Sequence, residues 1–201
     1  MRGLFVTFEG VDGCGKTTQI KFLKEYLEKK NKKVVLVREP GGTKISESIR
    51  DIILNVENSE MVDNCEMLLY AAARAQLVEQ VIRPNLESGA IVLCDRFVDS
   101  SYVYQGIARG LGLEKVEAIN KVAMNGIEPD MTLFFDIDPE ISLKRRMTVS
   151  SADRIEKEKL DFHKKVYQGY RYLANKYPDR IKTINANCGI EEVKQQIISL
   201  F

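Results

Sequence analysis

One segment near the start of the chain constrains it more than any other feature. Residues 10–17 read GVDGCGKT, which fills every position of the pattern G-x-x-x-x-G-K-[ST]. The apolar run 4–8 precedes this segment, and apolar residues at helical spacing, Ile20, Leu23 and Leu27, follow it. A glycine-rich turn between a strand and a helix points its backbone N–H groups at phosphate oxygens and adds the positive end of the helix dipole. The segment is therefore predicted to be a phosphate-binding loop (P-loop), and an ordinary glycine turn is the simpler alternative.

Two residues of this loop carry chemistry of their own. Lys16 is expected to reach the transferred phosphate as a point charge. The hydroxyl of Thr17 is expected to ligate the Mg²⁺ that bridges the phosphates. The motif thus indicates an enzyme that handles a nucleoside triphosphate with magnesium.

Length and charge fit one compact enzyme domain over residues 1–201. The chain has 201 residues, of which 44% are hydrophobic, enough to bury a sizeable core. With 30 Lys and Arg against 29 Asp and Glu, the formal net charge is +1. This balance suggests neither a nucleic-acid partner nor a membrane surface, so any anion site must be local.

The cysteines and the apolar runs bear on the compartment. Cys14, Cys65, Cys94 and Cys188 form no C-x-x-C pair and no metal-ligand spacing. The chain opens directly into a predicted strand, and no run approaches the roughly 18 apolar residues that a membrane span needs. We therefore expect reduced thiols and a cytoplasmic protein.

Short apolar runs alternate with helical patterns along the whole chain. Runs that are apolar throughout, such as 90–94, are typical of parallel strands buried on both faces. The pattern predicts an α/β fold with a five-stranded parallel sheet covered by helices on both faces. The predicted strands are 3–9, 33–37, 90–94, 131–137 and 180–184, and the long helices include 63–86 and 156–176.

Ligands of such sheets collect where the strands end, so the residues after each strand are candidates for chemistry. Charged residues of the segment 38–43 follow the second strand, and Asp95 and Arg96 follow the third. Asp95 is placed like a metal-site carboxylate, and Arg96 could grip a phosphate with two hydrogen bonds. The alternative is a surface ion pair between them.

Several stretches together resemble the thymidylate kinase family of nucleoside monophosphate kinases, in its bacterial type. The resemblance covers essentially the full chain, and the third stretch is highly specific to the family. It implies a P-loop NTPase fold with a mobile lid at about 145–154, and a kinase that transfers the γ-phosphoryl of ATP to dTMP, giving dTDP and ADP for dTTP synthesis. The stretches are 8–19, 38–43, 69–74, 95–106 and 153–156.

The resemblance implies roles for the acceptor site. Tyr70 and Arg74, at i and i+4, share one face of a helix, where the ring would stack on thymine and the guanidinium would donate to a carbonyl of the base. Tyr104 would lie under the sugar and penalise a 2′-hydroxyl. For both tyrosines the alternative is core packing. The implied dTMP contacts are Asp12, Arg38, Arg50, Tyr70, Arg74, Arg96, Ser100, Ser101, Tyr104 and Gln105.

Among the acceptor contacts, Arg50, beside Asp51, could instead be a solvated helical residue.

The donor side is implied in the same way. Ala186 follows the last strand and is the weakest contact, because a plain αβ loop explains it nearly as well. The implied ATP contacts are Gly10, Val11, Asp12, Gly13, Cys14, Gly15, Lys16, Thr17, Thr18, Arg145 and Ala186, with Thr17, Asp95 and Asp12 as metal ligands.

The lid departs from the family pattern. The P-loop position that carries arginine in one subgroup is Gly13, and no basic residue stands between Arg146 and Arg154. The lid charge must then come from Arg145, Arg146 or Arg154, and Arg146 with Arg154 is the expected pair. One alternative is that the basic run 144–146 only completes a helix C-terminus, where the helix dipole favours cations. A separate alternative for Arg145 is that it stacks on adenine, as the resemblance implies. The expected catalytic residues are Asp12, Lys16, Arg96, Arg146 and Arg154.

Other functions remain as alternatives. A GTPase would carry Asn-Lys-x-Asp, and the nearest match, residues 120–123, lacks the aspartate. An ATP-binding module without transfer, or a kinase for another nucleotide or a deoxynucleoside, is also compatible with a P-loop. A homodimer through the helix 63–86 is expected from the resemblance, although a core-facing stripe would look the same. His163, with no metal-ligand cluster around it, is expected to be a surface or packing residue.

Overall fold

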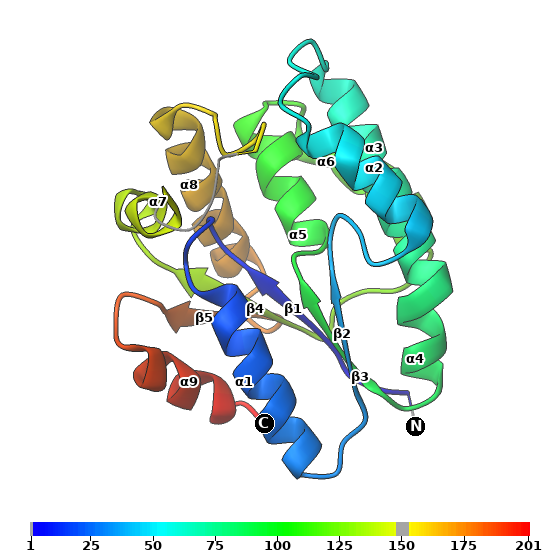
Figure 1. Cartoon of the computed structure of the whole chain (residues 1–201), viewed down its shortest axis with the longest axis vertical. Helices are drawn as coiled ribbons and strands as arrows, with labels where there is room; N and C mark the ends of the chain where they lie inside the picture. The colour runs from blue at the N-terminus through cyan, green and yellow to red at the C-terminus, as the bar shows by residue number, and fades with distance from the viewer. Residues whose placement is uncertain (1, 148–152) are drawn as a thin grey trace.

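The computed structural model describes residues 2–147 and 153–201, apart from the side chains of Arg146 and Met147. Its described strands form one parallel sheet in the order β2-β3-β1-β4-β5 (Figure 1). The strands are β1 (Phe5–Glu9), β2 (Val34–Arg38), β3 (Ile91–Asp95), β4 (Met131–Asp136) and β5 (Ile181–Asn185). Each strand lies within two residues of its predicted range, so the sheet predicted from the apolar runs is confirmed.

Helices follow every described strand. Two segments, η1 and η2, have π-helical hydrogen bonding and continue the α-helices before them. The helical elements are α1 (Lys16–Lys29), α2 (Lys44–Leu54), α3 (Asp63–Leu77), η1 (Val78–Ile82), α4 (Arg83–Glu87), α5 (Val98–Ser101), η2 (Tyr102–Ala108), α6 (Leu113–Met124), α7 (Pro139–Met147), α8 (Leu160–Lys176) and α9 (Ile190–Ile198).

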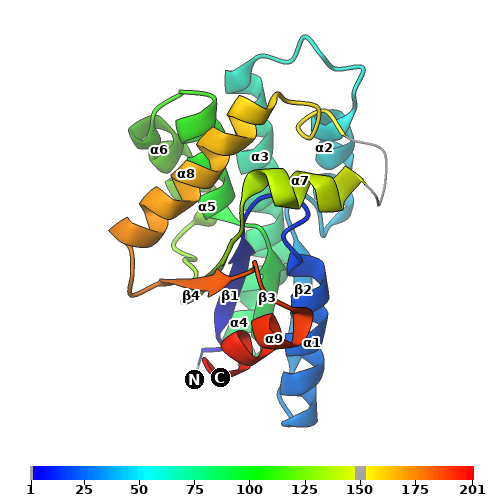
Figure 2. The same ribbon diagram turned by 90° about the vertical axis from the view of Figure 1, so that its left-hand side faces the viewer.

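The helices lie on both faces of the sheet, as expected. Figures 1 and 2 show α1 and α9 side by side on one face, with α8 and α4 on the other. Successive side chains of a strand point to opposite faces. Alternate residues of β1 therefore serve different layers: Val6 and Phe8 belong to the core cluster of α1, whereas Phe5 packs edge-on against Phe97 at a centroid distance of 4.9 Å.

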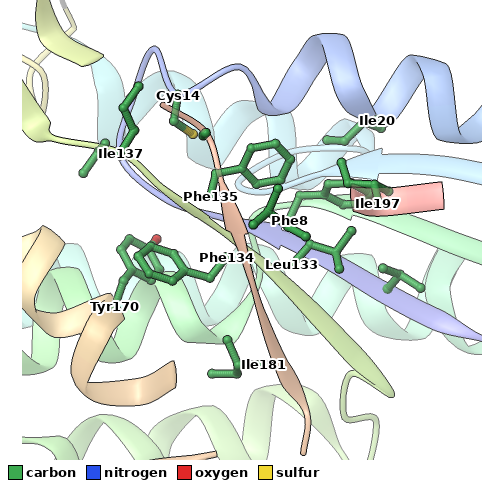
Figure 3. Packing of buried hydrophobic residues seen from close by; sticks show 14 of the residues in the cluster. Phe8, Cys14, Ile20, Leu133, Phe134, Phe135, Ile137, Tyr170, Ile181 and Ile197 are labelled. Atoms are coloured by element: carbon green, nitrogen blue, oxygen red, sulfur yellow. The ribbon is translucent and has the colours of Figure 1, made fainter. Parts of the chain in front are cut away.

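Aromatic side chains fill the main core on both sides of β4 (Figure 3). Phe135 lies with Phe8 at a centroid distance of 6.2 Å, near Ile20 of α1. Phe134 points the other way and stacks on Tyr170 of α8 at 5.4 Å. Burying each such side chain contributes about 1.5–3 kcal/mol, so this packing fixes α1 and α8 against the strand ends that carry the site.

The helix predicted from residue 156 is wrong at its start, because α8 begins at Leu160. The carboxylate oxygen Oδ1 of Asp153 accepts hydrogen bonds from the backbone N–H groups of Ile155 and Glu156, both at 2.9 Å. The backbone N–H of Asp153 donates in turn to Glu156 at 3.2 Å, so these bonds form a capping box over one short turn. That turn does not join α8, because the backbone of Lys159 is extended, with φ −66° and ψ 155°. The predicted helix 63–86 is present, but it consists of α3, η1 and α4, and it ends at Glu87.

The two remaining expectations concern single residues. All four cysteines are free thiols, as predicted. His163 is buried in α8, so it is a packing residue. Among the helices that the structure describes, none has the length and apolar character needed to cross a bilayer.

Candidate active site

A cavity of about 640 Å³ opens at the carboxyl ends of β1, β2 and β3. This is where ligands of open parallel sheets are expected. Its walls come from the P-loop, from the segments after β2 and β3, and from α2, α3, η2 and α7. The turn of residues 153–156 completes these walls. The lining residues include Asp12, Gly13, Cys14, Gly15, Lys16, Thr17, Thr18, Arg38, Glu39, Pro40, Arg50, Tyr70, Asp95, Arg96, Ser100, Ser101, Tyr104, Gln105, Arg145, Asp153, Ile155 and Glu156.

The P-loop adopts the conformation that its glycines predict. Gly10 has φ 141°, and a Cβ there would lie 2.9 Å from the carbonyl oxygen of Phe135. Gly15 is left-handed, with φ 96°, and is the N-cap of α1. Glycine alone tolerates both positions without strain. The first backbone N–H groups of α1 therefore face the cavity, where they can bind an anion.

Lys16 and Thr17 leave the P-loop toward different partners. The ammonium of Lys16 donates to the carbonyl oxygens of Gly10 and Val11 at 3.1 and 3.2 Å, so it stays inside the loop. The hydroxyl of Thr17 donates to the carboxylate of Asp95 at 3.4 Å. Two hard oxygen ligands so close together suit Mg²⁺, which keeps several waters and needs only one or two protein oxygens.

Arg96 is the most constrained side chain of the cavity. Its backbone has φ 67°, in the left-handed region that residues other than glycine rarely adopt. Its guanidinium donates to the carboxylate of Asp12 at 2.6 Å, to the hydroxyl of Tyr170 at 3.1 Å and to that of Ser100 at 3.2 Å. Burial raises the pKa of Asp12, but the charges of Arg96 and Lys16 outweigh burial and lower this pKa to about 2. Asp12 is thus ionised and fixes this cation beside the P-loop.

Behind Arg96 lies a buried carboxylate, Glu9, which ends β1. Its Oε2 accepts from the hydroxyls of Ser100 and Tyr170 at 2.6 and 2.8 Å. Its Oε1 accepts from the backbone N–H of Phe97 at 2.7 Å. Burial and the nearby charge of Asp99 raise the pKa of Glu9. Glu9 therefore orients the two hydroxyl groups that hold Arg96.

Two more arginines meet at the end of β2. Arg38 and Arg50 both donate to the carbonyl oxygen of Pro40, at 2.7 and 2.9 Å. Arg38 also pairs with Glu47 at 2.8 Å. Burial and the charge of Arg38 lower the pKa of Arg50. Arg50 is not a solvated helical residue, since its side chain is half-buried and lines the cavity. With Arg96, these side chains offer cations to an anion beyond the P-loop.

The end of the cavity away from the P-loop is lined by aromatic and amide groups. Tyr70 of α3 is half-buried, and Ser101 and Gln105 come from α5 and η2. The ring of Tyr104 lies 5.3 Å from the guanidinium carbon of Arg96. Its buried hydroxyl has no hydrogen-bond partner among the described residues. A flat apolar surface with a few polar groups is suited to a base and a sugar.

Arg74 lies behind this wall and not on it. Its side chain is 1% exposed, and it donates to Glu39 at 2.5 and 2.8 Å, to Ser101 at 2.9 Å, and to Asn120. Glu39 has its other oxygen, Oε1, buried without a partner among the described residues. Burial raises the pKa of Glu39 to about 7, against the lowering effect of Arg74. Arg74 therefore holds the hydroxyl of Ser101 in position from inside the protein.

The basic residues of the predicted lid lie in different places. Arg145, in the last turn of α7, lines the cavity. The P-loop is tied to the same helix, because the hydroxyl of Ser142 donates to the carbonyl oxygen of Asp12 at 2.5 Å. The side chain of Arg146 falls outside the described part of the chain, as do residues 148–152. Arg154 points into α3, where it pairs with Glu66 at 2.6 Å.

Sequence reasoning assigned no role to the buried acids that organise the site, Glu9, Glu39 and Glu66. Glu9 and Glu39 could have been found, because each carries a charge at or just after the end of an apolar strand. Glu66 shows no such signal, since it looks like any acid in the first turn of a helix. Ala186 is buried beside Asp136 and does not line the cavity.

Known proteins resemble this chain in both sequence and fold. A family model described as thymidylate kinase matches residues 8–197. A curated thymidylate kinase of Thermoanaerobacter sp. (strain X514) is 54% identical over 200 residues, which cover 100% of this chain and 98% of that protein. One from Clostridium novyi (strain NT) is 48% identical over 198 residues, 98% and 97% of the two chains. A crystal structure of thymidylate kinase from Ehrlichia chaffeensis superposes with a TM-score of 0.80 at 32% identity, covering 100% of this chain and 99% of that one.

Proposed function

The chain belongs to the thymidylate kinase family, and on that premise we propose that it transfers the γ-phosphoryl of ATP to dTMP, giving dTDP and ADP for dTTP synthesis. The observation that carries the proposal is one cavity lined both by a P-loop and by a second group of cations from outside that loop, Arg38, Arg50 and Arg96. A single phosphate site would suit a nucleotide hydrolase. Two anion sites in one cavity suit a donor and an acceptor.

The acceptor lies with its phosphate among these arginines and its base against Tyr70. Ser101 and Gln105 face the edge of the base. Arg74 contributes indirectly, because it donates to the hydroxyl of Ser101 and holds it in place. Tyr104 lies under the sugar, where its buried ring leaves little room for an added 2′-hydroxyl. Exclusion by the ring supports a deoxynucleotide as acceptor.

Transfer needs no nucleophilic side chain. An oxygen of the acceptor phosphate attacks the γ-phosphorus of ATP in line with the leaving β-phosphate oxygen, and ADP departs. Asp12 holds Arg96 at 2.6 Å, so this cation is already oriented when the phosphate arrives. Lys16 and the backbone N–H groups of the P-loop then offset charge on the transferring group. Positioning and charge together account for the catalysis.

We assign the metal to the oxygen atoms of Thr17 and Asp95, with Asp12, which lines the same cavity, acting through water. When bound, Mg²⁺ would neutralise phosphate charge. The donor adenine lies over the end of α7, where Arg145 lines the cavity, with Ala186 as a more distant contact. Arg146 supplies lid charge in this proposal.

The wider context is proposed on separate grounds. Residues 1–201 form one kinase domain whose lid spans about 145–154, and the reaction takes place in the cytoplasm. A homodimer is supported by exposed apolar side chains on the neighbouring helices α3 and α6. Val62, the N-cap of α3, is 66% exposed, Leu68 of α3 is 54% exposed, and Val122 of α6 is 81% exposed. Apolar side chains exposed on adjacent helices are a feature of protein interfaces.

An acceptor panel tests the function. The purified protein is assayed for ADP release with Mg²⁺-ATP and dTMP, dUMP, UMP, CMP, AMP, GMP or thymidine. We expect turnover with dTMP well above every ribonucleotide and above thymidine, which lacks the phosphate that the arginines hold. Equal ADP release with and without acceptors would instead indicate an ATPase, and ATP binding without any release would indicate a binding module.

A further inference from the structure

A buried carboxylate just outside the cavity joins segments that lie far apart in the sequence. Glu66 of α3 is 1% exposed, and both of its oxygens are occupied. Its Oε1 accepts from Gln105 at 2.8 Å and from the Nε of Arg109 at 3.3 Å. Its Oε2 accepts from Arg154 at 2.6 Å and from the Nη2 of Arg109 at 3.2 Å. One acid thus holds two arginines from different parts of the chain.

Arg154 is held at three points, and none of them is in the P-loop. Besides Glu66, its Nε donates to the carbonyl oxygen of Ile53 at 2.8 Å, and its backbone N–H donates to that of Leu54 at 3.3 Å. Its side chain is 12% exposed. The Nε and Nη2 of the guanidinium are therefore engaged by α2 and α3, and Arg154 is not among the residues that line the cavity.

The neighbours of Arg154 do line it. Asp153, Ile155 and Glu156 contribute to the cavity wall, and they form the turn that Asp153 caps. Hydrogen bonds inside the turn set its shape but not its place in the molecule. Its place is set by Ile155, which is 5% exposed in the main core, and by the attachment of Arg154 to α2 and α3.

The charge arrangement makes this attachment costly to undo. Burial raises the pKa of Glu66, but the hydrogen bond from Gln105 and the charge of Arg109 outweigh burial and lower this pKa. The acid is therefore ionised. Withdrawing Arg154 toward the phosphates would leave a buried carboxylate with one cation fewer, and an incompletely compensated buried charge is strongly unfavourable. Arg154 is therefore poorly suited to swing to the γ-phosphate in each turnover.

We propose that Arg154 is a positioning residue: held by Glu66, it fixes the turn 153–156 as a wall of the acceptor site, and other cations offset the charge of the transferring phosphoryl. The proposal rests on the proposed function and narrows it, because it removes one of the candidate lid arginines from the chemical step. Glu66 becomes part of the acceptor site without touching the acceptor.

Steady-state kinetics of four variants test this assignment. Glu66→Gln and Arg154→Met each remove the attachment, Arg154→Lys keeps the charge without the Nε donor, and Glu66→Gln/Arg154→Met removes both partners. Because the turn acts on acceptor binding, we expect both single variants to raise the KM for dTMP about tenfold, with kcat lowered less than about tenfold. The double variant should be no worse than the worse single variant, because both remove one interaction. Arg154→Lys should recover part of the KM.

A different role for Arg154 predicts a different pattern. An arginine that neutralises the transferring phosphoryl is worth about 10³–10⁵ in kcat. A loss of that size in Arg154→Met at unchanged KM, together with an unaltered kcat in Glu66→Gln, would overturn the proposal. Glu79→Gln and Arg83→Met are the matched controls, because this pair is also an Arg–Glu contact, at 2.9 Å, but lies on the surface. Neither control should change KM or kcat.

Hydrogen exchange supplies a readout that does not need turnover. In Glu66→Gln, the amides of residues 154–156 should exchange at least about tenfold faster than in the wild type, whereas Glu79→Gln should leave them unchanged. Unchanged exchange in Glu66→Gln would contradict the attachment. If Glu66→Gln does not fold, Arg154→Met decides, because Glu66 keeps Gln105 and Arg109 there. Wild-type protein inactive on dTMP would refute the function alone, and the exchange result would still decide the attachment.

Discussion

The conformation of Arg96 shows how one residue combines strain with function. A left-handed backbone costs an L-residue roughly 1–2 kcal/mol, and such strain persists where the surroundings over-determine it. Here the backbone N–H of Arg96 is bonded to the carbonyl oxygen of Phe8 at 3.0 Å, and the guanidinium is held by Asp12, Ser100 and Tyr170. These contacts fix the direction of the cation before the acceptor phosphate arrives.

Arg96→Lys should separate charge from geometry. The ammonium keeps the charge but cannot donate from a planar fork to an acid and two hydroxyls at once. We expect kcat/KM for dTMP to fall about 10²-fold or more, while the unfolding temperature changes by only a few degrees. Arg83→Lys, at the surface ion pair with Glu79, is the control and should be unchanged. Near wild-type kcat/KM in Arg96→Lys would show that the directed hydrogen bonds are not needed.

At the residue scale, the sequence predicted the side chains that line the cavity better than those that support them. Lys16, Thr17 and Asp95 follow from motif and strand order alone. The partner of Arg74 could not be predicted, because Glu39 is 35 residues away and only the packed sheet brings the two together. The same holds for Arg154 and Glu66, which are 88 residues apart.

Among the elements, the contact between α8 and η2 matters most for the acceptor site. Gly169 of α8 faces η2, and a Cβ there would lie 3.0 Å from a methyl group of Val103 and 3.2 Å from the terminal methyl of Ile107. Val103 is fully buried and β-branched, so it has little freedom to move away. The absence of a side chain at Gly169 therefore lets η2, with Tyr104 and Gln105, approach α8.

Gly169→Ala should be destabilising despite the better helix propensity of alanine. The propensity gain is about 1 kcal/mol, whereas overpacking of a tight contact costs typically 1–3 kcal/mol. We expect a net loss of about 1 kcal/mol in the free energy of unfolding, measured by denaturant titration, together with a raised KM for dTMP. Gln168→Ala, at the preceding exposed position of the same helix, controls for propensity. A stabilised Gly169→Ala with unchanged KM would mean that η2 accommodates the methyl group.

The elements that were predicted well have a common physical reason. Strands buried on both faces are apolar throughout, so β3 and β4 are visible in any window of the sequence. The π-helical segments η1 and η2 could not be predicted, because one extra residue per turn leaves no change in composition. The start of α8 was missed because the chain is extended at Lys159, which separates the capped turn at Asp153 from the helix.

For the molecule as a whole, the acids of the site give stability an uncommon pH dependence. Asp12 has a lowered pKa, so its contribution is present above its ordinary pKa of 3.8 and is lost as the pH falls toward 2. Glu39 is shifted the opposite way, from 4.5 to about 7. The folded state therefore binds more protons than the unfolded state between these values. The free energy of unfolding must fall as the pH rises through that window.

Glu39→Gln tests this dependence. In the wild type, Glu39 should lower the free energy of unfolding by about 2–3 kcal/mol between pH 4.5 and pH 8, since one pKa unit corresponds to about 1.4 kcal/mol. Glu39→Gln should be close to the wild type in stability at pH 5, where the protonated carboxyl and the amide are both neutral acceptors for Arg74, and its stability should vary less with pH. Urea titrations at several pH values measure both. Parallel curves for the two proteins would show that Glu39 is ionised throughout; Glu79→Gln, on the surface, should follow the wild type.

The central claim is that this cavity transfers a phosphoryl group between two nucleotides and does not merely hydrolyse ATP. ³¹P nuclear magnetic resonance distinguishes the two directly, because it resolves a new diphosphate from inorganic phosphate. With Mg²⁺-ATP and dTMP, the wild type should consume the dTMP signal and produce dTDP and ADP in equal amounts, with little inorganic phosphate, and Lys16→Ala should produce almost none. Inorganic phosphate appearing in step with ADP while dTMP remains unchanged would contradict the account.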